Sequence, residues 1–158
     1  RRLRTGETGL YKQLRLQALL DSPEAFSTSF AEASRRTDES WRRQADSSAQ
    51  GSERAAFLAF SGEQAIGLAA LYRIDEQPEA GELLQLWVHP EFRRTGAGQA
   101  LLNSVYSWAK ETGFRRILAR VRKSNPQALH FFFAYGFSEL DPSKEDDPES
   151  ISIKMDVA

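Results

Sequence analysis

The sequence predicts an α/β (α+β) fold, in which a mixed and mostly antiparallel sheet of about six or seven strands is flanked by about four helices. The first third of the chain has helical periodicity, with apolar residues three or four positions apart. The chain then changes to short apolar runs separated by turn residues, which is the pattern of a strand meander. A strand–helix–strand pattern follows, and such a unit beside a meander indicates a mixed sheet covered by helices. At 158 residues the chain has the usual length of one domain, and we expect residues 1–158 to form a single one.

Two helices are expected before the meander. The first covers residues 7–20, is capped by Thr5, and ends at a proline-containing breaker, residues 21–23. The second begins after Thr37 and carries Trp41. In the first helix Leu10, Leu14 and Ala18 form one apolar stripe.

Turn residues and periodicity divide the rest of the chain. Residues 75–81 are expected to form a polar, acidic turn with Pro78, and Gly113 is expected to end the most regular helix at its C′ position. An acidic loop, residues 141–150, separates the last two strands. The expected strands cover residues 55–60, 65–74, 82–88, 116–121, 137–140 and 151–157, and the expected helices cover 98–112 and 125–135.

The composition excludes several classes of protein. Lys and Arg number 21 and Asp and Glu number 22, so the formal net charge of −1 argues against nucleic acid as a partner. The absence of cysteine removes disulfides, thiolate metal ligands and cysteine nucleophiles. Two histidines, His89 and His130, leave little for a metal site, and we expect no metal. The apolar runs are shorter than the ~20 residues of a membrane span, and no signal-peptide pattern opens the sequence. We therefore expect a cytoplasmic protein with no membrane partner.

The most informative stretch of the sequence predicts an anion site. A strand ends at Val88, a loop with Arg93 and Arg94 follows, and Gly96 and Gly98 bracket the start of a helix. The first turn of a helix has backbone N–H groups without intrahelical partners and lies at the positive end of the helix dipole. A pyrophosphate fits this arrangement. The alternative is that the glycines merely shape a turn and the arginines are solvated.

Two motifs resemble the GNAT superfamily of N-acetyltransferases. The signature of that family, Arg/Gln-x-x-Gly-x-Gly/Ala at the start of a helix, is matched by residues 93–98, and Val88-His89-Pro90-Glu91 resembles its usual lead-in. The N-terminal helices are similar to a common variant of the family through residues 15–19 and 22–26. The second motif consists of Asn125, Ala128, Phe131, Phe132, Gly136 and Phe137.

The resemblance implies acetyl-CoA as the acetyl donor. Its pyrophosphate would bind the backbone N–H groups of residues 94–99, next to Arg93, and a Cβ on Gly98 would crowd it. Its pantetheine arm would lie along the exposed backbone of residues 86–88, where this strand diverges from residues 116–121. The implied coenzyme-binding residues are Leu86, Trp87, Val88, Arg93, Arg94, Thr95, Gly96, Ala97, Gly98, Gln99, Asn125, Ala128 and Phe132.

Direct transfer of the acetyl group needs a base for the amine and a proton for the leaving thiolate. Glu82 matches the glutamate that some family members use as the base, and the alternative is a solvated carboxylate. Asn125 would hold the pantetheine arm, and Phe132 would flank it near the sulfur. Many relatives have a tyrosine acid at the latter position, but phenylalanine cannot donate a proton. Tyr135, three residues further on, is a candidate for this acid, and its alternative role is packing.

The expected reaction is transfer of an acetyl group to a primary amine, on a small cationic molecule or a peptide. Acidic loops at the expected acceptor groove would favour a cationic acceptor. The alternative function is a non-catalytic acyl-CoA-binding module or sensor that lacks proton handling. A homodimer is a possible assembly. The acidic residues are Asp75, Glu76, Glu79, Glu82, Asp141, Glu145, Asp146, Asp147 and Glu149.

Overall fold

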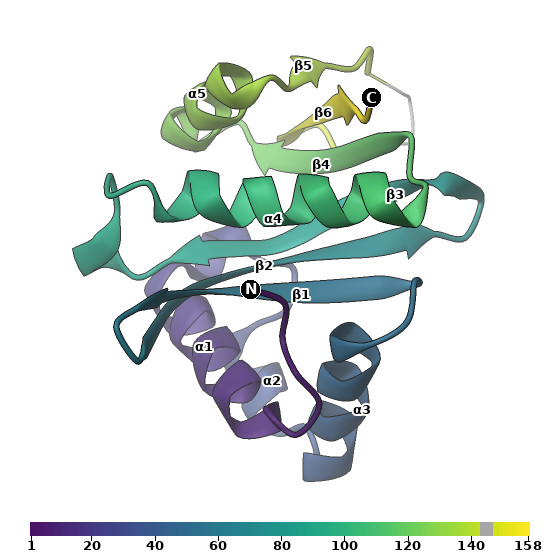
Figure 1. The fold of residues 1–158 in the computed structure, drawn as a ribbon. Coiled ribbons are helices and arrows are strands. Elements are labelled where there is room, and N and C mark those ends of the chain that lie inside the picture. Colours follow the sequence, from purple (N-terminus) through teal and green to yellow (C-terminus); the bar gives the residue numbers. More distant parts are fainter. Residues whose placement is uncertain (143–146) are drawn as a thin grey trace.

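The computed structural model describes residues 1–142 and 147–158 and contains a six-stranded sheet in the order β1-β2-β3-β4-β6-β5 (Figure 1). Neighbouring strands are antiparallel except for β3 and β4, which are parallel. The strands are β1 (Arg54–Ser61), β2 (Gln64–Ile74), β3 (Gln77–Val88), β4 (Arg116–Arg122), β5 (Ser138–Glu139) and β6 (Ser150–Asp156). The helices are α1 (Thr8–Asp21), α2 (Phe30–Ser34), α3 (Asp38–Ala49), α4 (Ala97–Thr112) and α5 (Pro126–Tyr135), with short 3₁₀ turns η1 (Pro23–Ala25) and η2 (Pro90–Phe92). The predicted mixed, mostly antiparallel sheet is therefore confirmed.

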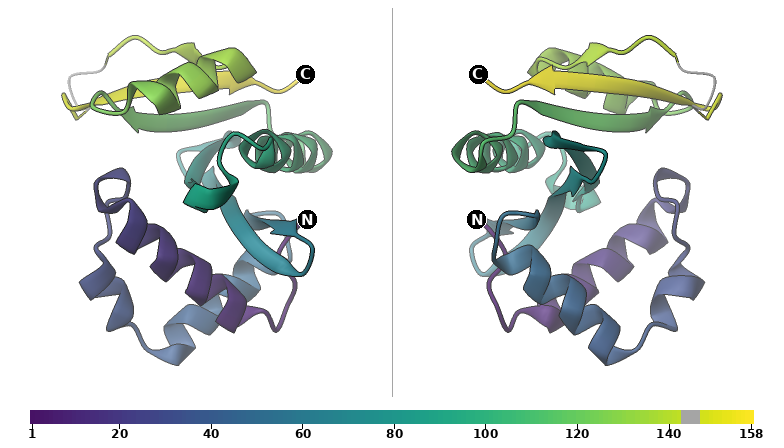
Figure 2. Two further views of the ribbon diagram at one scale, coloured as in Figure 1. Left: turned by 90° about the vertical axis from the view of Figure 1, so that its left-hand side faces the viewer. Right: turned by 90° about the vertical axis from the view of Figure 1, so that its right-hand side faces the viewer.

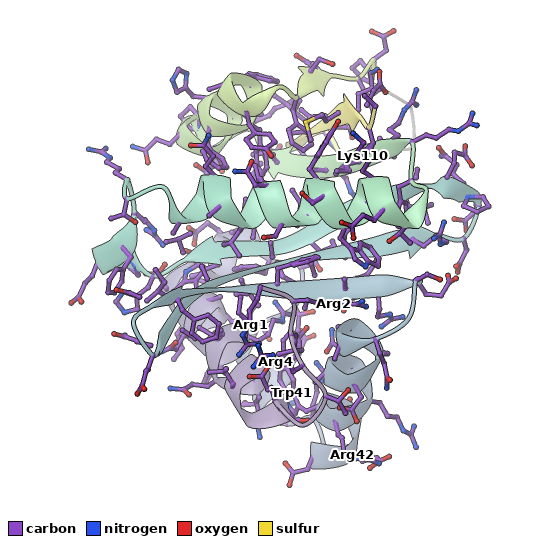
Figure 3. The ribbon with its side chains drawn as sticks, in the orientation of Figure 1. Arg1, Arg2, Arg4, Trp41, Arg42 and Lys110 are labelled. Carbon is purple, nitrogen blue, oxygen red and sulfur yellow. The ribbon has the colours of Figure 1, made fainter. Side chains whose placement is uncertain are left out.

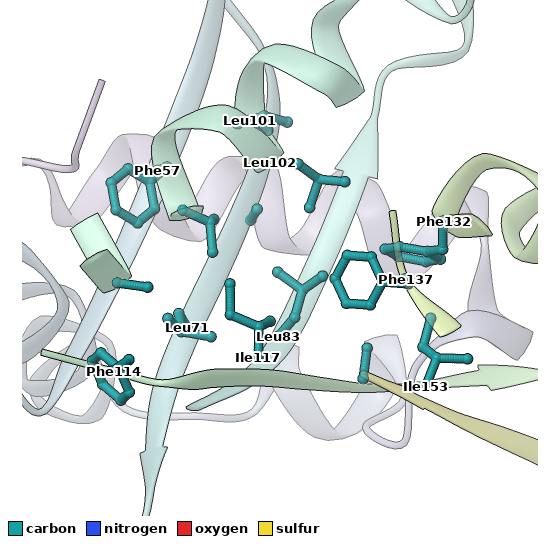
Figure 4. Close-up of a cluster of buried hydrophobic side chains, with 14 of the residues drawn as sticks. Phe57, Leu71, Leu83, Leu101, Leu102, Phe114, Ile117, Phe132, Phe137 and Ile153 are labelled. Atoms are coloured by element: carbon teal, nitrogen blue, oxygen red, sulfur yellow. The ribbon is translucent and has the colours of Figure 1, made fainter. Parts of the chain in front are cut away.

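The two faces of the sheet carry different helices (Figures 1 and 2). Helices α4 and α5 cover one face, where Phe57, Leu71 and Leu83 of the sheet pack with Leu101 and Leu102 of α4 (Figure 4). Helices α1, α2 and α3 cover the other face, where the opposite side chains of β1 and β2 are buried. Because successive side chains of a strand point to opposite faces, each central strand contributes to both clusters.

The N-terminal helices differ from expectation in two details. Helix α1 is not capped by Thr5, because the chain turns once more before it and Glu7 becomes the N-cap residue without a side-chain capping bond. The carboxylate of Glu7 instead accepts the backbone N–H of Arg4 at 2.7 Å and pairs with the Arg1 guanidinium. The Arg1 hydrogen bond lowers the pKa of Glu7 to about 2. The five-residue helix α2 was not predicted, since it is too short to show a helical period.

Strand β3 begins earlier than the sequence predicted. Residues 75–81 were expected to be a turn, but the structure has the turn at Asp75 and Glu76 and starts β3 at Gln77. Backbone and arginine contacts hold this polar end in the sheet, because the Pro78 carbonyl accepts the Arg73 guanidinium and the Glu79 carbonyl accepts a backbone N–H from the start of β4. Strand β5 is shorter than expected, at two residues. The expected acidic residues Glu145 and Asp146 lie outside the described residues.

Strands β3 and β4 separate after a short parallel contact, as the sequence predicted. Their pairing covers Ala80 to Glu82 on β3, opposite residues 116–118 on β4. Beyond this point β3 stays paired with β2 and β4 stays paired with β6. Strand β3 also has a bulge, since Leu84 to Trp87 spans three steps opposite two steps of β2. Gln85, within the bulge, has a positive φ of 62°. The backbone of residues 83–88 therefore forms an open edge next to the gap between the strands.

The outer edge of β1 is partly covered by the N-terminal segment, which carries Arg1, Arg2 and Arg4 (Figure 3). Leu3 donates its backbone N–H to Ala56 at 2.8 Å, and Arg2 forms an antiparallel bridge with Phe57. Pairing of this kind protects an edge strand from pairing with another chain. None of the helices in the described ranges is long and apolar enough to cross a membrane.

Candidate active site

The loop before α4 has the geometry of an anion site. Arg94 has a φ of 64° and Gly96, the N-cap residue of α4, has a φ of 91°, so the chain turns sharply into the helix. The first hydrogen bond of the helix runs from the Ala100 N–H to the Gly96 carbonyl at 3.0 Å. The N–H groups of residues 97–99 therefore have no intrahelical acceptor. They point from the positive end of a 16-residue helix, which is where a diphosphate binds well.

The side chain of Arg93 is tied to the ends of two other elements. Its Nε donates to the Val88 carbonyl at 3.0 Å, and its guanidinium pairs with the Asp21 carboxylate at 2.5 Å. The same carboxylate oxygen of Asp21 accepts the indole N–H of Trp87 at 3.0 Å. Burial acts to raise the pKa of Asp21, but hydrogen bonds from Trp87, Ser22 and Arg93 outweigh burial and lower it. Arg93 thus holds the loop against β3 and α1, and its contact with a phosphate stays a prediction.

Gly98 lies against the ring of Phe131 on α5. A Cβ at this position would lie 3.1 Å from Cζ of Phe131, so the ring of α5 already restricts the site before any pyrophosphate is bound. Phe132 is 6% exposed and packs edge-on against Phe137, with ring centroids 5.2 Å apart (Figure 4). Phe131 is therefore the α5 aromatic next to the first turn of α4, and Phe132 lies in the core.

The start of α5 combines a cap with an available amide. Asn125 accepts the backbone N–H of Ala128 at 3.2 Å through Oδ1, and Pro126 occupies the first turn. The amide nitrogen of Asn125 is a donor that the cap does not use. The role of Asn125 in holding a pantetheine arm stays a prediction.

The open edge of β3 contains the predicted pantetheine residues. Leu86 and Val88 pack partly against the cluster under α4, whereas Trp87 points to the opposite face and is 5% exposed. On that opposite face the Tyr11 hydroxyl donates to Oε1 of Gln85 at 2.8 Å and links α1 to the bulge. Neither Tyr11 nor the bulge at Gln85 was singled out from the sequence, because their contact joins positions 74 residues apart.

Glu82 lies where β3 and β4 separate. It pairs with Leu118 as the last residue of the parallel contact, and its side chain is 30% exposed. The Arg120 guanidinium lies 3.6 Å from Oε1 of Glu82. The role of Glu82 as a base stays a prediction.

Tyr135 has its hydroxyl engaged elsewhere. The hydroxyl is 2.7 Å from Oδ1 of Asn103 on α4, and burial raises the pKa of Tyr135. This contact supports a packing role between α4 and α5, and the acid role of Tyr135 stays a prediction. Across residues 1–142 and 147–158, no group of three His, Asp or Glu side chains could hold a metal ion.

Comparison with known proteins agrees with this architecture. The sequence profile of the acetyltransferase (GNAT) family matches residues 16–137. A GNAT-family acetyltransferase from Streptococcus pneumoniae has a TM-score of 0.81 at 17% identity, covering 99% of this chain and 98% of that chain. The PaiA N-acetyltransferase of Thermoplasma acidophilum, solved with coenzyme A, has a TM-score of 0.78 at 19% identity, covering 99% of this chain and 96% of that chain. The chain therefore belongs to the GNAT family of acetyltransferases, as the sequence motifs indicated.

Among curated relatives, an amino-acid acetyltransferase of Shewanella oneidensis is 38% identical over 72 residues. The matched region is 46% of this chain and 15% of the length of that relative. The similarity thus concerns a part of a much longer protein.

Proposed function

We propose that this protein transfers an acetyl group from acetyl-CoA directly to a primary amine. The observation that carries the proposal is the open N-terminus of α4, with N–H groups free at residues 97–99, beside the gap between β3 and β4. The free N–H groups suit a pyrophosphate, and the open edge of β3 suits the amide groups of a pantetheine arm. The structural neighbour solved with coenzyme A supports this choice of cosubstrate.

Glu82 is the proposed base. The amine nitrogen attacks the thioester carbonyl, the C–N bond forms, the C–S bond breaks, and the amine proton passes to Glu82 directly or through water. The thiolate takes its proton from water in this scheme, because Phe132 has no hydroxyl and Tyr135 bonds to Asn103. The position of Glu82 at the separation of the strands supports its role.

The transfer reaction is tested by release of free CoA thiol. Acetyl-CoA is offered with small cationic amines, amino acids and peptides, and the thiol is measured in each mixture. An acetyltransferase releases thiol with at least one acceptor and forms the matching acetyl-amine. The alternative, a non-catalytic acyl-CoA-binding module, binds acetyl-CoA in calorimetry and releases no thiol with any of them.

Glu82→Gln tests the base. A positioned general base contributes about 10²–10⁴-fold in rate, so kcat/KM should fall within that range at neutral pH while CoA affinity is unchanged. The loss should shrink at high pH, where the amine loses its proton without help. Glu63→Gln, an exposed carboxylate in the turn between β1 and β2, is the control and should stay near the wild-type rate. Full activity of Glu82→Gln across the pH range would remove Glu82 from the mechanism.

The remaining parts of the proposal concern the whole protein. Residues 1–158 are proposed to act as one domain in the cytoplasm, with a small cationic amine or a peptide amine as acceptor and a homodimer as a possible assembly. Size-exclusion chromatography with light scattering tests the assembly.

A further inference from the structure

Helix α1 carries a buried charge for which the described residues provide no counter-ion. Arg15 is 7% exposed, although arginine is seldom buried without a partner. Its Nε and Nη1 atoms are buried and have no hydrogen-bond partner within the described part of the chain. The ion pairs found among these residues do not include Arg15 either.

This absence of partners is costly because a guanidinium stays charged at any physiological pH. A buried charge that makes no hydrogen bonds is strongly unfavourable, and proteins normally pair it. The one aromatic contact, with Phe26 at 5.7 Å from the guanidinium carbon, satisfies none of the in-plane N–H groups. The nearest carboxylate on α1, Asp21, is already occupied by Trp87 and Arg93.

Arg15 lies on the side of α1 that meets the active-site strand. One turn before it, Tyr11 donates to Gln85 in the bulge of β3. At the end of the same helix, Asp21 accepts the indole N–H of Trp87. Residues 11 and 15 are neighbours on the helix surface, one turn apart, so Arg15 begins on the same side of α1 as the contact with the bulge. The positive charge of Arg15 is also near enough to act on the Tyr11 hydroxyl, although burial dominates and raises the pKa of Tyr11.

The contacts of Tyr11 and Asp21 thus place α1 against the bulged part of β3, next to its open edge, on the face opposite α4. The proposed coenzyme reaches that edge from the α4 side, so the α1 face is the side left for the acceptor. On this face Arg15 is covered by the segment after η1, in which Phe26 is half-buried. The preceding turn η1 contains no buried residue. Access of a ligand to the guanidinium would require Phe26, whose ring lies 5.7 Å from it, to move.

We propose that Arg15 binds the carboxylate of the acceptor, so that the acceptor class is an α-amino acid or another amine with a carboxylate beside it. This inference rests on the proposed acetyl transfer, and it replaces the small cationic amine or peptide amine proposed above with an acceptor that also carries a carboxylate. A carboxylate matches the planar guanidinium and can bind either bidentate edge, Nε with Nη2 or Nη1 with Nη2. Each edge contains one of the two unpartnered nitrogens. Binding would supply the missing counter-ion and hold the amine near the bulge of β3.

The first test needs no variant. Each of the twenty amino acids is offered with acetyl-CoA, and the best acceptor is compared with its amide and with the amine that lacks the carboxylate. We expect kcat/KM to be about 10–100-fold higher for the acid, the range that charged hydrogen bonds support. Equal rates for the acid, the amide and the decarboxylated amine would overturn the proposal while leaving the acetyltransferase function intact.

The second test measures binding without turnover. Calorimetry with the same amino acid is carried out in the presence of CoA, which cannot donate an acetyl group. Arg15→Met should weaken binding of the acid about 10–100-fold and leave binding of the amide unchanged. Arg15→Lys keeps the charge without the planar fork and should fall between the two. If thiol release fails with every acceptor but this carboxylate-dependent binding is present, the proposed reaction is wrong and the anion site remains.

The third measurement separates a ligand site from a structural role. Removal of an unpartnered buried charge should leave the unfolding midpoint of Arg15→Met equal to or above that of the wild type. Arg43→Met on α3 removes an exposed charge far from the site and is the control for binding. A strongly lowered midpoint together with unchanged preference for the acid would show that Arg15 only supports the fold. If Arg15→Met does not fold, Arg15→Lys and the comparison of acid with amide decide the question.

Discussion

The contact between Asp21 and Arg93 links the end of α1 to the loop before α4, and replacing Asp21 by Asn tests how much it contributes. Asn keeps the volume and one oxygen acceptor, so Trp87 can still donate, but the charge is lost. The Asp21 side chain is 28% exposed and that of Arg93 is 48% exposed, so solvent screens the pair. Exposed ion pairs contribute about 0.2–1 kcal/mol and charged hydrogen bonds about 1.5–3 kcal/mol. Allowing for this screening, we expect a loss of about 1 kcal/mol at pH 7.

The stability difference between wild type and Asp21→Asn should depend on pH in a defined direction. The folded pKa of Asp21 is below its ordinary value of 3.8. A carboxyl with a lowered folded pKa stabilises the protein above its unfolded pKa, and this stabilisation is lost as the pH falls through the folded pKa. The difference between wild type and Asp21→Asn should therefore be full at neutral pH and shrink once the pH falls below about 4.

Urea unfolding at pH 7 and at pH 3.5 measures both differences, and Arg93→Met with the double variant isolates the pair. A loss of about 1 kcal/mol corresponds to about 2–4 °C in the unfolding midpoint for a chain of this size. A variant as stable as the wild type at pH 7 would refute the reasoning. A difference that stays constant down to low pH would also refute it, because it could not come from the charge.

Three further predictions concern packing around the site. Gly98→Ala places a Cβ 3.1 Å from the Phe131 ring, so stability should fall by about 1 kcal/mol in denaturant unfolding and recover when Phe131→Leu is added. Gly67→Ala is predicted to be worse, about 1–3 kcal/mol or more, because its Cβ would lie 2.8 Å from the backbone oxygen of Trp87, which cannot move aside; a loss below 0.5 kcal/mol would count against this. Tyr135→Phe removes the hydrogen bond to α4 and should lower stability by about 1 kcal/mol while kcat stays within a few-fold; a drop of 100-fold or more in kcat would instead identify the hydroxyl as the acid.

Local patterns predicted the central elements of the fold and failed where distant contacts decide. Helix α4 and the β1–β2 hairpin were predicted well because periodicity and turn residues define them locally. The start of β3 was missed because its polar residues are held by backbone pairing and by Arg73, which no pattern reports. The cap of α1 was misassigned because Glu7 turns back to Arg4.

In the candidate site, too, local features were predicted from the sequence and contacts between distant residues were not. The loop from Arg93 to Gly98 was found from its own spacing, and the structure gives it the expected open helix end. The partner of Arg93 is 72 residues away, and no spacing rule predicts that contact. Which of Phe131 and Phe132 faces the first turn of α4 depends on how α5 is rotated, and consecutive aromatics in the sequence leave that rotation undetermined.

The three-residue pairing of β3 with β4 also has a mechanical consequence. The sheet consists of two halves, one of β1, β2 and β3 and the other of β4, β5 and β6. Backbone pairing joins the halves only along this short contact. Beyond this pairing, buried side chains such as Leu83, Ile117 and Ile153 hold the two halves of the sheet together. Relative rotation of the halves is therefore opposed mainly by side-chain packing along their boundary. A ligand that bonds to both halves restrains them relative to each other. Its binding free energy is then measured as slower hydrogen exchange of the backbone amides in β4, β5 and β6.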